Sequence, residues 1–331
     1  MHDAGETRRF KRDLTMSFDF EAAVQAPFRM QPGLRRLAAG ASQLTPLGPG
    51  SRHQREKLAV LSAYATQAFV RQAGFDDTPA LQSLAAHAAL EHPHAWQWDG
   101  ARACASLLGV AVEDDTVHQF SAGVFGLGDE LSRCLDGLPA GWRLAGLLSL
   151  AFAEDFAIVD GVDATIPWIA ACLPSHWAPA AKVGRHFAEV HAPVADNALI
   201  VRASEHLTRM VCGPERWERF VWTVSRQPRL NAHPALVDPA PWAGDAFADA
   251  AAPRAWFRCE RQTFIPLPER QQAVFTISVD SVPLAQAIDT PARAQRLHDA
   301  IATMSDAVLA YRSLLAVREP LLAWLALRSR A

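Results

Sequence analysis

The chain has 331 residues, half of them hydrophobic, so it can bury a substantial core in one large domain or two modest ones. Its net charge is −3 at pH 7, and no stripe rich in lysine and arginine recurs along it, which argues against nucleic acid as a principal partner. No apolar run reaches the roughly 18 residues of a membrane span, since the longest, 144–152, is followed by Glu154 and Asp155. We therefore expect a soluble protein.

The first fifteen residues are charged throughout and lack the apolar segment and small-residue cleavage site of a secretory signal. We expect a cytoplasmic protein in which residues 1–20 form a disordered extension and 21–331 a single domain. The five cysteines show no CxxC pairing, which argues against a structural zinc site or a disulfide framework.

The N-terminal part of the domain, about 21–140, is predicted to be helical. Residues 31–53 are rich in proline, glycine and serine and indicate a loop. Apolar residues near helical spacing predict a helix over 56–73. A second helix, 79–91, begins with proline at a plausible first-turn position.

The second part, about 141–325, is predicted to be rich in sheet. Two apolar runs, 144–159 and 165–173, flank a turn signal at 160–163 that is typical of a hairpin. Further predicted elements are strands at 187–191, 220–225 and 273–280, a helix at 198–211, and a C-terminal helix over 293–317. The expected fold class is α+β, with an antiparallel sheet flanked by helices.

His191 stands at the end of a predicted strand, and Pro193 stops the strand from continuing, so the ring can face a cavity. Neutral imidazole is a common metal ligand, although a lone histidine is more often a structural residue. The nearest competitor is His186, five residues earlier. On a strand the two rings would point to opposite faces.

Glu154 and Asp155 are adjacent in an apolar strand, so one of the two carboxylates must face inward and be paired or protonated. An amine substrate would be a suitable partner. The alternative is an ion pair with Arg185, Lys182 or Arg261, or a network of backbone amides.

A third group of polar residues, at 258–262, precedes a predicted strand. Its arginines suit carboxylate ligands, and a solvated turn is the alternative. Tryptophans at 168, 177 and 222 could wall a flat ligand or belong to the core.

No GxGxxG motif precedes a convincing helix, and the Walker, GxSxG and HExxH motifs are absent. Nucleotide-dependent, serine-hydrolase and zinc-protease functions therefore lack their motifs.

In order, the chain reads GLRRL, LAFAEDFAIVDG, CLPSHWAPAAKVGRHFAEVHAPV, ERFVWTVS, RCERQTFIPLPERQQAVFTISV and AYRSLL. This succession resembles the haem-dependent oxidative N-demethylase family, long catalogued as a domain of unknown function, which includes the haem-bearing subunit of dimethylamine monooxygenase. The resemblance covers nearly all of residues 25–325.

The resemblance implies a PAS-like antiparallel sheet with helices that binds haem b. It also implies the O2-dependent removal of an N-methyl group, as formaldehyde, from a small secondary amine such as dimethylamine. Electrons would come from a separate reductase with FMN and an iron–sulfur cluster, or from a ferredoxin subunit. Tetrahydrofolate would accept the formaldehyde. The chain has neither an iron–sulfur cysteine pattern nor a dinucleotide fingerprint, which agrees with a separate reductase.

The resemblance also implies roles for particular residues. His191 would be the axial iron ligand, and Glu154 with Asp155 would orient or deprotonate the amine. Residues expected to bind the haem propionates or other anions, or to lie against the cofactor, are Lys182, Arg185, Arg261 and Trp177.

The chain departs from the family pattern in two places. Ala195 replaces an expected proline, and Val221 replaces an expected asparagine in the Arg-x-Asn-Trp element. The lost amide at position 221 could remove a hydrogen bond to the substrate, to folate or to the backbone, so it affects the expected substrate more than the expected cofactor.

Two other functions compete with the enzyme. A PAS-like module that binds haem, or a small molecule such as folate, could act as a sensor whose conformation a partner reads, although no signalling coiled coil or output domain is recognisable. A folate-binding accessory subunit without haem is the third interpretation.

Overall fold

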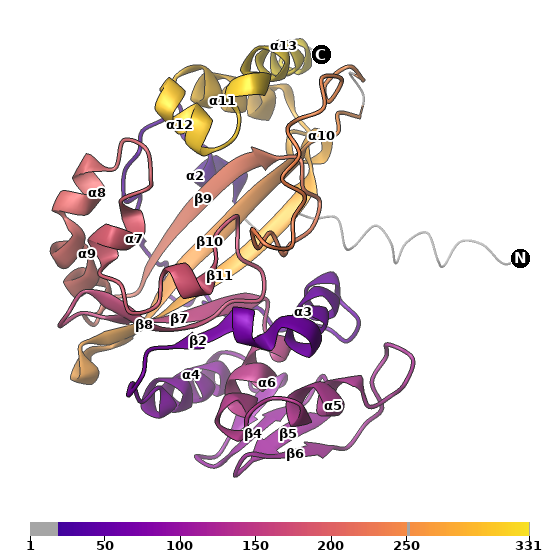
Figure 1. Ribbon diagram of the computed structural model, residues 1–331, viewed down its shortest axis with the longest axis vertical. Helices are drawn as coiled ribbons and strands as arrows, with labels where there is room; N and C mark the ends of the chain where they lie inside the picture. Colours follow the sequence, from indigo (N-terminus) through magenta and orange to yellow (C-terminus); the bar gives the residue numbers. More distant parts are fainter. Residues whose placement is uncertain (1–18, 250–251, 331) are drawn as a thin grey trace, which may run out of the picture.

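A seven-stranded antiparallel sheet forms the centre of the protein in the computed structural model, which describes residues 19–249 and 252–330 (Figure 1). The strand order is β1-β9-β10-β11-β7-β8-β2. The bounds are β1 Arg35–Arg36, β2 Phe69–Arg71, β7 Glu154–Asp160, β8 Thr165–Ala170, β9 Trp217–Ser225, β10 Trp256–Leu267 and β11 Gln272–Pro283. Nearly all of the expected extension, 1–18, lies outside the described residues.

The sheet confirms the hairpin predicted around Asp160. Strands β7 and β8 pair antiparallel, and the Asp160 carboxylate accepts a hydrogen bond from the Val162 amide at 2.9 Å. The strands predicted at 220–225 and 273–280 are also present, inside β9 and β11. Since Val274 and Thr276 are as buried as Ile277 and Val279, both faces of β11 are covered.

The expectation of a helical segment over 21–140 was wrong in part, because this segment also contains a second antiparallel sheet. Its strands, in the order β3-β4-β5-β6, are Trp96–Trp98, Arg102–Ala105, Val110–Glu113 and Thr116–Gln119. Each strand has only three or four residues, too few for an alternating pattern to be recognised. The helices around it are α3 Arg52–Ala68, α4 Thr78–Glu91, α5 Glu130–Asp136 and α6 Arg143–Ala151.

Two predicted strands were wrong. The apolar run 144–159 begins as helix α6 and becomes strand β7 only at Glu154, because an uninterrupted apolar run does not distinguish the two. Residues Phe187–His191 form helix α7. His186 caps this helix, because its Nδ1 accepts a hydrogen bond from the Ala188 amide at 3.2 Å.

The C-terminal segment forms several helices instead of the single one expected over 293–317. Ser305 caps a new helix there, and Ser313 adopts a positive φ of 57° that a helix does not allow. The helix expected over 198–211 is likewise split at Ala203. The remaining helices are α2 Phe20–Ala23, α8 Ala198–Arg202, α9 Ser204–Val211, α10 Leu284–Ala287, α11 Pro291–Ala302, α12 Asp306–Tyr311 and α13 Arg318–Arg328, and short 3-10 turns lie at Ala140–Trp142, Pro179–Ala181, Pro268–Arg270 and Leu315–Val317.

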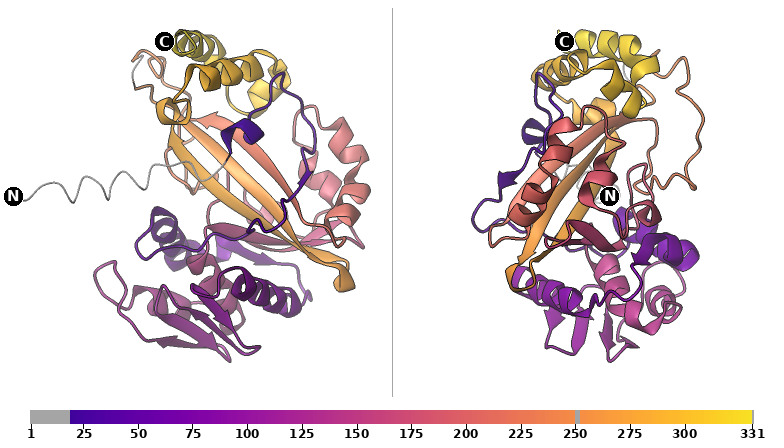
Figure 2. Two further views of the ribbon diagram at one scale, coloured as in Figure 1. Left: turned by 180° about the vertical axis from the view of Figure 1, so that it is seen from behind. Right: turned by 60° about the vertical axis from the view of Figure 1, so that its left-hand side comes forward.

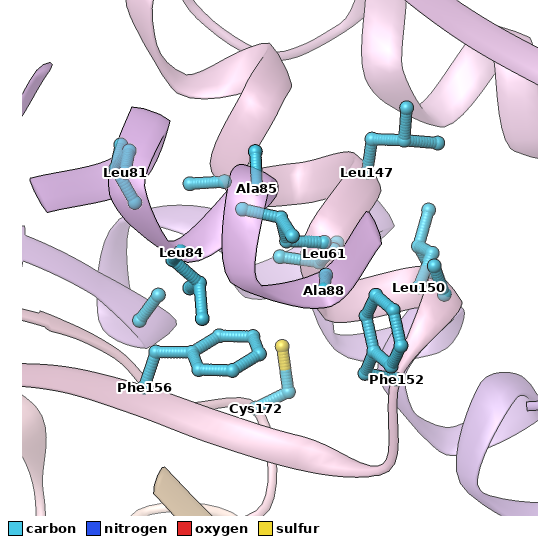
Figure 3. Close-up of a cluster of buried hydrophobic side chains, with 14 of the residues drawn as sticks. Leu61, Leu81, Leu84, Ala85, Ala88, Leu147, Leu150, Phe152, Phe156 and Cys172 are labelled. Atoms are coloured by element: carbon cyan, nitrogen blue, oxygen red, sulfur yellow. The ribbon is translucent and has the colours of Figure 1, made fainter. Parts of the chain in front are cut away.

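Helices cover the sheet from two ends and build two large cores. At one end α3, α4 and α6 pack on β7 and β8 around Phe152 and Phe156 (Figure 3). The C-terminal helices α11, α12 and α13 lie at the other end (Figure 2). The buried cluster there includes Phe257 and Leu297. The mixture of helices and antiparallel sheets confirms the α+β class. No helix among the described residues is long and apolar enough to cross a membrane.

Phe152 joins the first core to the sheet, since its side chain is fully buried and its ring lies 5.6 Å from that of Trp96. We expect Phe152→Ala to lower the free energy of unfolding by about 3–5 kcal/mol, because it removes buried apolar contacts and leaves a cavity. Denaturant unfolding measures this loss. Leu90→Ala, at a position 84% exposed, is the control and should change little. Equal effects of the two substitutions would contradict the assignment of this core.

Candidate functional site

A cavity of about 1490 Å³ lies against the central sheet. Its walls come from β7, β9, β10 and β11, from segment 22–35, from residues 175–194 with helix α7, and from loop 234–242. This volume exceeds the roughly 300–1,000 Å³ of common small-molecule sites. The cavity therefore has room for a large ligand.

His191 lines the cavity from the last residue of α7. Its Nδ1 lies 2.9 Å from the carbonyl oxygen of Phe187, which can only accept, so Nδ1 carries the proton and Nε2 keeps its lone pair. Nε2 has no hydrogen-bond partner among the described residues. Burial lowers the pKa of His191 to about 4, so the ring is neutral at pH 7. A neutral, oriented imidazole is the form that binds metals.

The other histidines near this site differ from His191. His186 caps α7 with its own Nδ1 and is not among the residues that line the cavity. His176, which the sequence did not single out, lines the cavity from an exposed loop position with φ 63°. Its ring makes no hydrogen bond within the described part of the chain. Two histidines, His176 and His191, therefore face the cavity.

Three of the predicted cofactor-binding residues line the cavity together. Lys182 places its Nζ 5.4 Å from the centre of the Trp177 ring, a cation–π arrangement. Burial lowers the pKa of Lys182, and Glu260 acts in the opposite direction. Arg185 is exposed, and its guanidinium makes no ion pair with any described residue. Lys182 and Arg185 are thus available to an anion.

Arg261, the fourth predicted residue, does not reach the cavity. Its Nε donates to the Glu218 carboxylate at 3.1 Å, and its Nη2 donates to the carbonyl oxygen of Ser42 at 3.0 Å. The guanidinium already has internal partners on the other face of β10.

Glu154 and Asp155 are fully buried and are not among the cavity-lining residues. Asp155 pairs with the buried Lys57 at 3.2 Å and accepts a hydrogen bond from the Leu173 amide at 2.7 Å. Glu154 accepts one from the Thr45 amide at 2.9 Å. The geometry matches the alternative interpretation, in which the carboxylates are bound by an ion pair and by backbone amides. The cation of the ion pair is Lys57, and not Arg185, Lys182 or Arg261 as the sequence suggested.

The cavity also contains charged residues that the sequence did not single out as a site. Arg219 lines it from β9, and its guanidinium makes no hydrogen bond or ion pair with the described residues, while its Nε is buried. Burial lowers the pKa of Arg219, and Glu260 raises it. Glu260 and Gln262 face the same cavity from β10, where Gln262 pairs across the strands with Arg219. The available sequence signal was a basic residue inside strand β9, on the face that it shares with Val221 and Thr223.

Arg258, unlike Arg219, has a structural role, because its guanidinium links two segments of the cavity wall by hydrogen bonds. Its guanidinium donates to Ser175 Oγ at 2.7 Å and to the carbonyl oxygens of Arg229 at 2.8 Å and Leu230 at 2.5 Å. These bonds connect the loop before Trp177 to the segment after β9. Burial lowers the pKa of Arg258 to about 10, so it remains charged at neutral pH.

In one part of the cavity, Arg312 lies beside two aromatic rings that pack edge to face on each other, with their centres 6.3 Å apart. Its guanidinium carbon is 4.9 Å from the centre of the Phe28 ring and 5.1 Å from that of Trp222, and it donates to the Trp222 carbonyl oxygen. Its Nε has no hydrogen-bond partner among the described residues. This part of the cavity combines the Arg312 cation with the aromatic side chains of Phe28 and Trp222.

The fold and the cavity define an α+β protein with a large cavity that is lined by several cationic side chains. A family model described as haem-dependent oxidative N-demethylase, alpha subunit-like, matches residues 143–322, more than half of the chain, so the chain belongs to this family. The match extends from α6 to α13 and confirms the resemblance seen in the sequence. It supports a haem-dependent oxidative N-demethylase function in general terms, and "alpha subunit" indicates an assembly of several subunits.

The Lys57–Asp155 pair is expected to be essential for stability. Lys57→Met leaves the Asp155 carboxylate buried without its cation, and we expect a loss of about 3–5 kcal/mol in the free energy of unfolding. Urea denaturation measures it. The double variant Lys57→Met with Asp155→Leu should recover most of the loss, and a double variant no more stable than the single one would contradict the pairing.

Glu154 should make stability depend on pH. Burial raises its pKa to about 7 from an ordinary value of 4.5, so the folded protein keeps a proton that the unfolded chain loses between these values. Stability from this group is complete below pH 4.5 and is lost as the pH rises through 7. Glu154→Gln should therefore gain stability relative to the parent between pH 5 and pH 9, by at most about 3 kcal/mol.

Chemical denaturation of both proteins at pH 5 and pH 9 measures this difference. Glu189→Gln, at an exposed position, is the control and should show no pH-dependent change. An equal effect of Glu154→Gln at the two pH values would contradict the raised pKa.

Proposed function

We propose that this protein is the haem-bearing subunit of an oxidative N-demethylase. Its substrates would be O2 and a small secondary methylamine of the dimethylamine type, its product would be formaldehyde, and a separate FMN and iron–sulfur reductase or ferredoxin subunit would supply electrons. The single observation that carries the proposal is His191, a neutral imidazole with its Nδ1 held by a backbone carbonyl and its Nε2 free, in the wall of a large cavity.

The residues around His191 fit a haem. Arg219 has a guanidinium with a buried Nε and no partner among the described residues, and such a charge is expensive to bury unless a ligand anion or water satisfies it. Lys182 and Arg185 are further cations for two propionates. Apolar wall residues such as Phe275 and Ile277 suit the porphyrin faces. Arg219 thus takes the propionate-binding role that the sequence suggested for Arg261.

Bound haem would supply the O2-activating centre at which the N-methyl group is oxidised. The protein's own contribution is binding and exclusion. His191 would hold the iron from one side, the cationic side chains would fix the propionates, and the sheet wall would keep bulk water from the reacting methyl group. In this account Asp155 acts through the Leu173 amide, which it holds at the start of the loop to Trp177. Asp155 is a positioning residue.

The remaining parts of the proposal concern the domain, its location and the acceptor of formaldehyde. An antiparallel sheet flanked by helices is what a PAS-like catalytic domain requires, and we propose that 21–331 forms one such unit in the cytoplasm. Tetrahydrofolate, as the formaldehyde acceptor, would suit the part of the cavity beside Arg312, because this residue offers a cation to an anionic ligand and the neighbouring rings of Phe28 and Trp222 offer apolar contact.

His191→Ala tests the iron ligand. We expect haem affinity to fall at least about tenfold while far-ultraviolet circular dichroism stays unchanged, because the ring makes only one hydrogen bond in the fold. Haem content after titration and desalting is the readout. His186→Ala is the matched control and should retain haem. Normal haem content in His191→Ala would overturn the assignment, and loss in His176→Ala alone would transfer it to His176.

A further inference from the structure

Glu260 is a buried carboxylate that faces the cavity. Its side chain is 7% exposed, and it lines the cavity from the middle of β10. One carboxylate oxygen accepts a hydrogen bond from the Gln262 amide at 2.6 Å. The other oxygen, Oε1, makes no hydrogen bond with the described residues. It is also not one of the fully buried side-chain atoms that lack a partner, so a ligand in the cavity can reach it. This oxygen can accept a hydrogen bond from a ligand.

No described cation lies close enough to Glu260 to form an ion pair. The nearby cations are Lys182, Arg219 and Arg258, whose pKa values burial lowers and Glu260 raises. Arg258 is bound to the loop carbonyls. If haem carboxylates engage Lys182 and Arg219, as proposed above, Glu260 is left as a buried negative charge without a partner.

The cross-strand neighbour of Glu260 cannot supply that partner. Val221 on β9 stands directly opposite Glu260, and paired residues of an antiparallel sheet share a face with their Cβ atoms about 4.5–5.5 Å apart. Val221 also lines the cavity and has no polar atom in its side chain. The carboxylate therefore stands beside an apolar surface, an arrangement that suits a small cation with attached methyl groups.

We propose that Glu260, fixed by Gln262, is the residue that recognises the substrate as a small secondary alkylammonium ion. One N–H of the ammonium donates to Oε1, and the methyl groups lie against Val221. This inference rests on the proposed function and gives Glu260 the amine-binding role that the sequence assigned to Glu154 and Asp155. Those two are bound by Lys57, Thr45 and the Leu173 amide and do not line the cavity.

The test is equilibrium dialysis of the full haem-loaded protein with isotopically labelled dimethylammonium, with the haem content of every variant measured in parallel. Glu260→Gln keeps the shape and removes the charge, and should weaken binding by about 10–100-fold with haem content unchanged, because a charge-assisted hydrogen bond is lost. Glu269→Gln removes an exposed carboxylate that is not among the cavity-lining residues and should leave binding unchanged.

Val221→Ala provides an independent test without altering the carboxylate. It removes the methyl groups of the side chain opposite Glu260, so dimethylammonium binding should weaken several-fold while haem content stays unchanged, because the substrate methyl groups lose an apolar contact. Val221→Ile is the control that keeps an apolar side chain there, and it should weaken binding less than Val221→Ala.

The inference is overturned if Glu260→Gln binds dimethylammonium within about twofold of the parent, or if it loses haem together with the amine, which would place Glu260 with the cofactor. It is also overturned if the parent protein does not bind dimethylammonium. Failure of the proposed function is separate. If the parent takes up no haem, the dialysis is repeated on the haem-free full chain, and a specific loss in Glu260→Gln still supports amine recognition there.

Discussion

The cost of burying charge governs this structure. Buried ionised groups need partners, and the protein meets this need in two different ways. In the closed core, Lys57 pairs with Asp155 and also donates to the carbonyl oxygens of Phe152 and Glu154. Around the cavity, the guanidinium of Arg219 and one oxygen of Glu260 make no hydrogen bond or ion pair with the residues that the structure describes. The first set builds the fold, and the second is available to ligands.

The two sets are mechanically connected through the loop that carries Trp177. Asp155 holds the Leu173 amide at one side of this loop, and Arg258 holds Ser175 and the carbonyl oxygens of Leu173 and Pro174 from the sheet. A loop fixed at both faces by buried charges offers a rigid wall, which favours a preorganised ligand site over one that forms on binding. The paired charges thus position the cavity without entering it.

Those parts of the fold that carry strong local signals could be predicted from the sequence. The turn at Asp160, the helix after Pro79 and the alternating strand β11 all formed as expected. Helix α7 was mistaken for a strand because five residues before a proline carry too little periodicity to decide. The break at Ser305 was missed because the apolar stripe continues through it, while a cap and a left-handed residue interrupt the backbone.

For the site, the sequence identified segments that line the cavity, but it did not show which residues of each strand face the cavity. Within the polar cluster of β10, Glu260 and Gln262 point into the cavity, whereas Arg261, one residue away, points to the opposite face and pairs with Glu218. A shift of one position reverses the face of a strand residue, so composition alone could not assign them. Arg219 was missed because the lack of a hydrogen-bond acceptor around its guanidinium can be recognised only from the three-dimensional structure.

The most direct test of the central claim is the absorption spectrum of the parent protein during haem titration, followed by reduction and exposure to carbon monoxide. The account predicts a Soret band that saturates at one haem per chain and shifts with carbon monoxide, as expected for a haem iron with an accessible coordination position. A spectrum that remains that of free haem, with no saturation at one equivalent, would contradict the claim that the cavity beside His191 is a haem site.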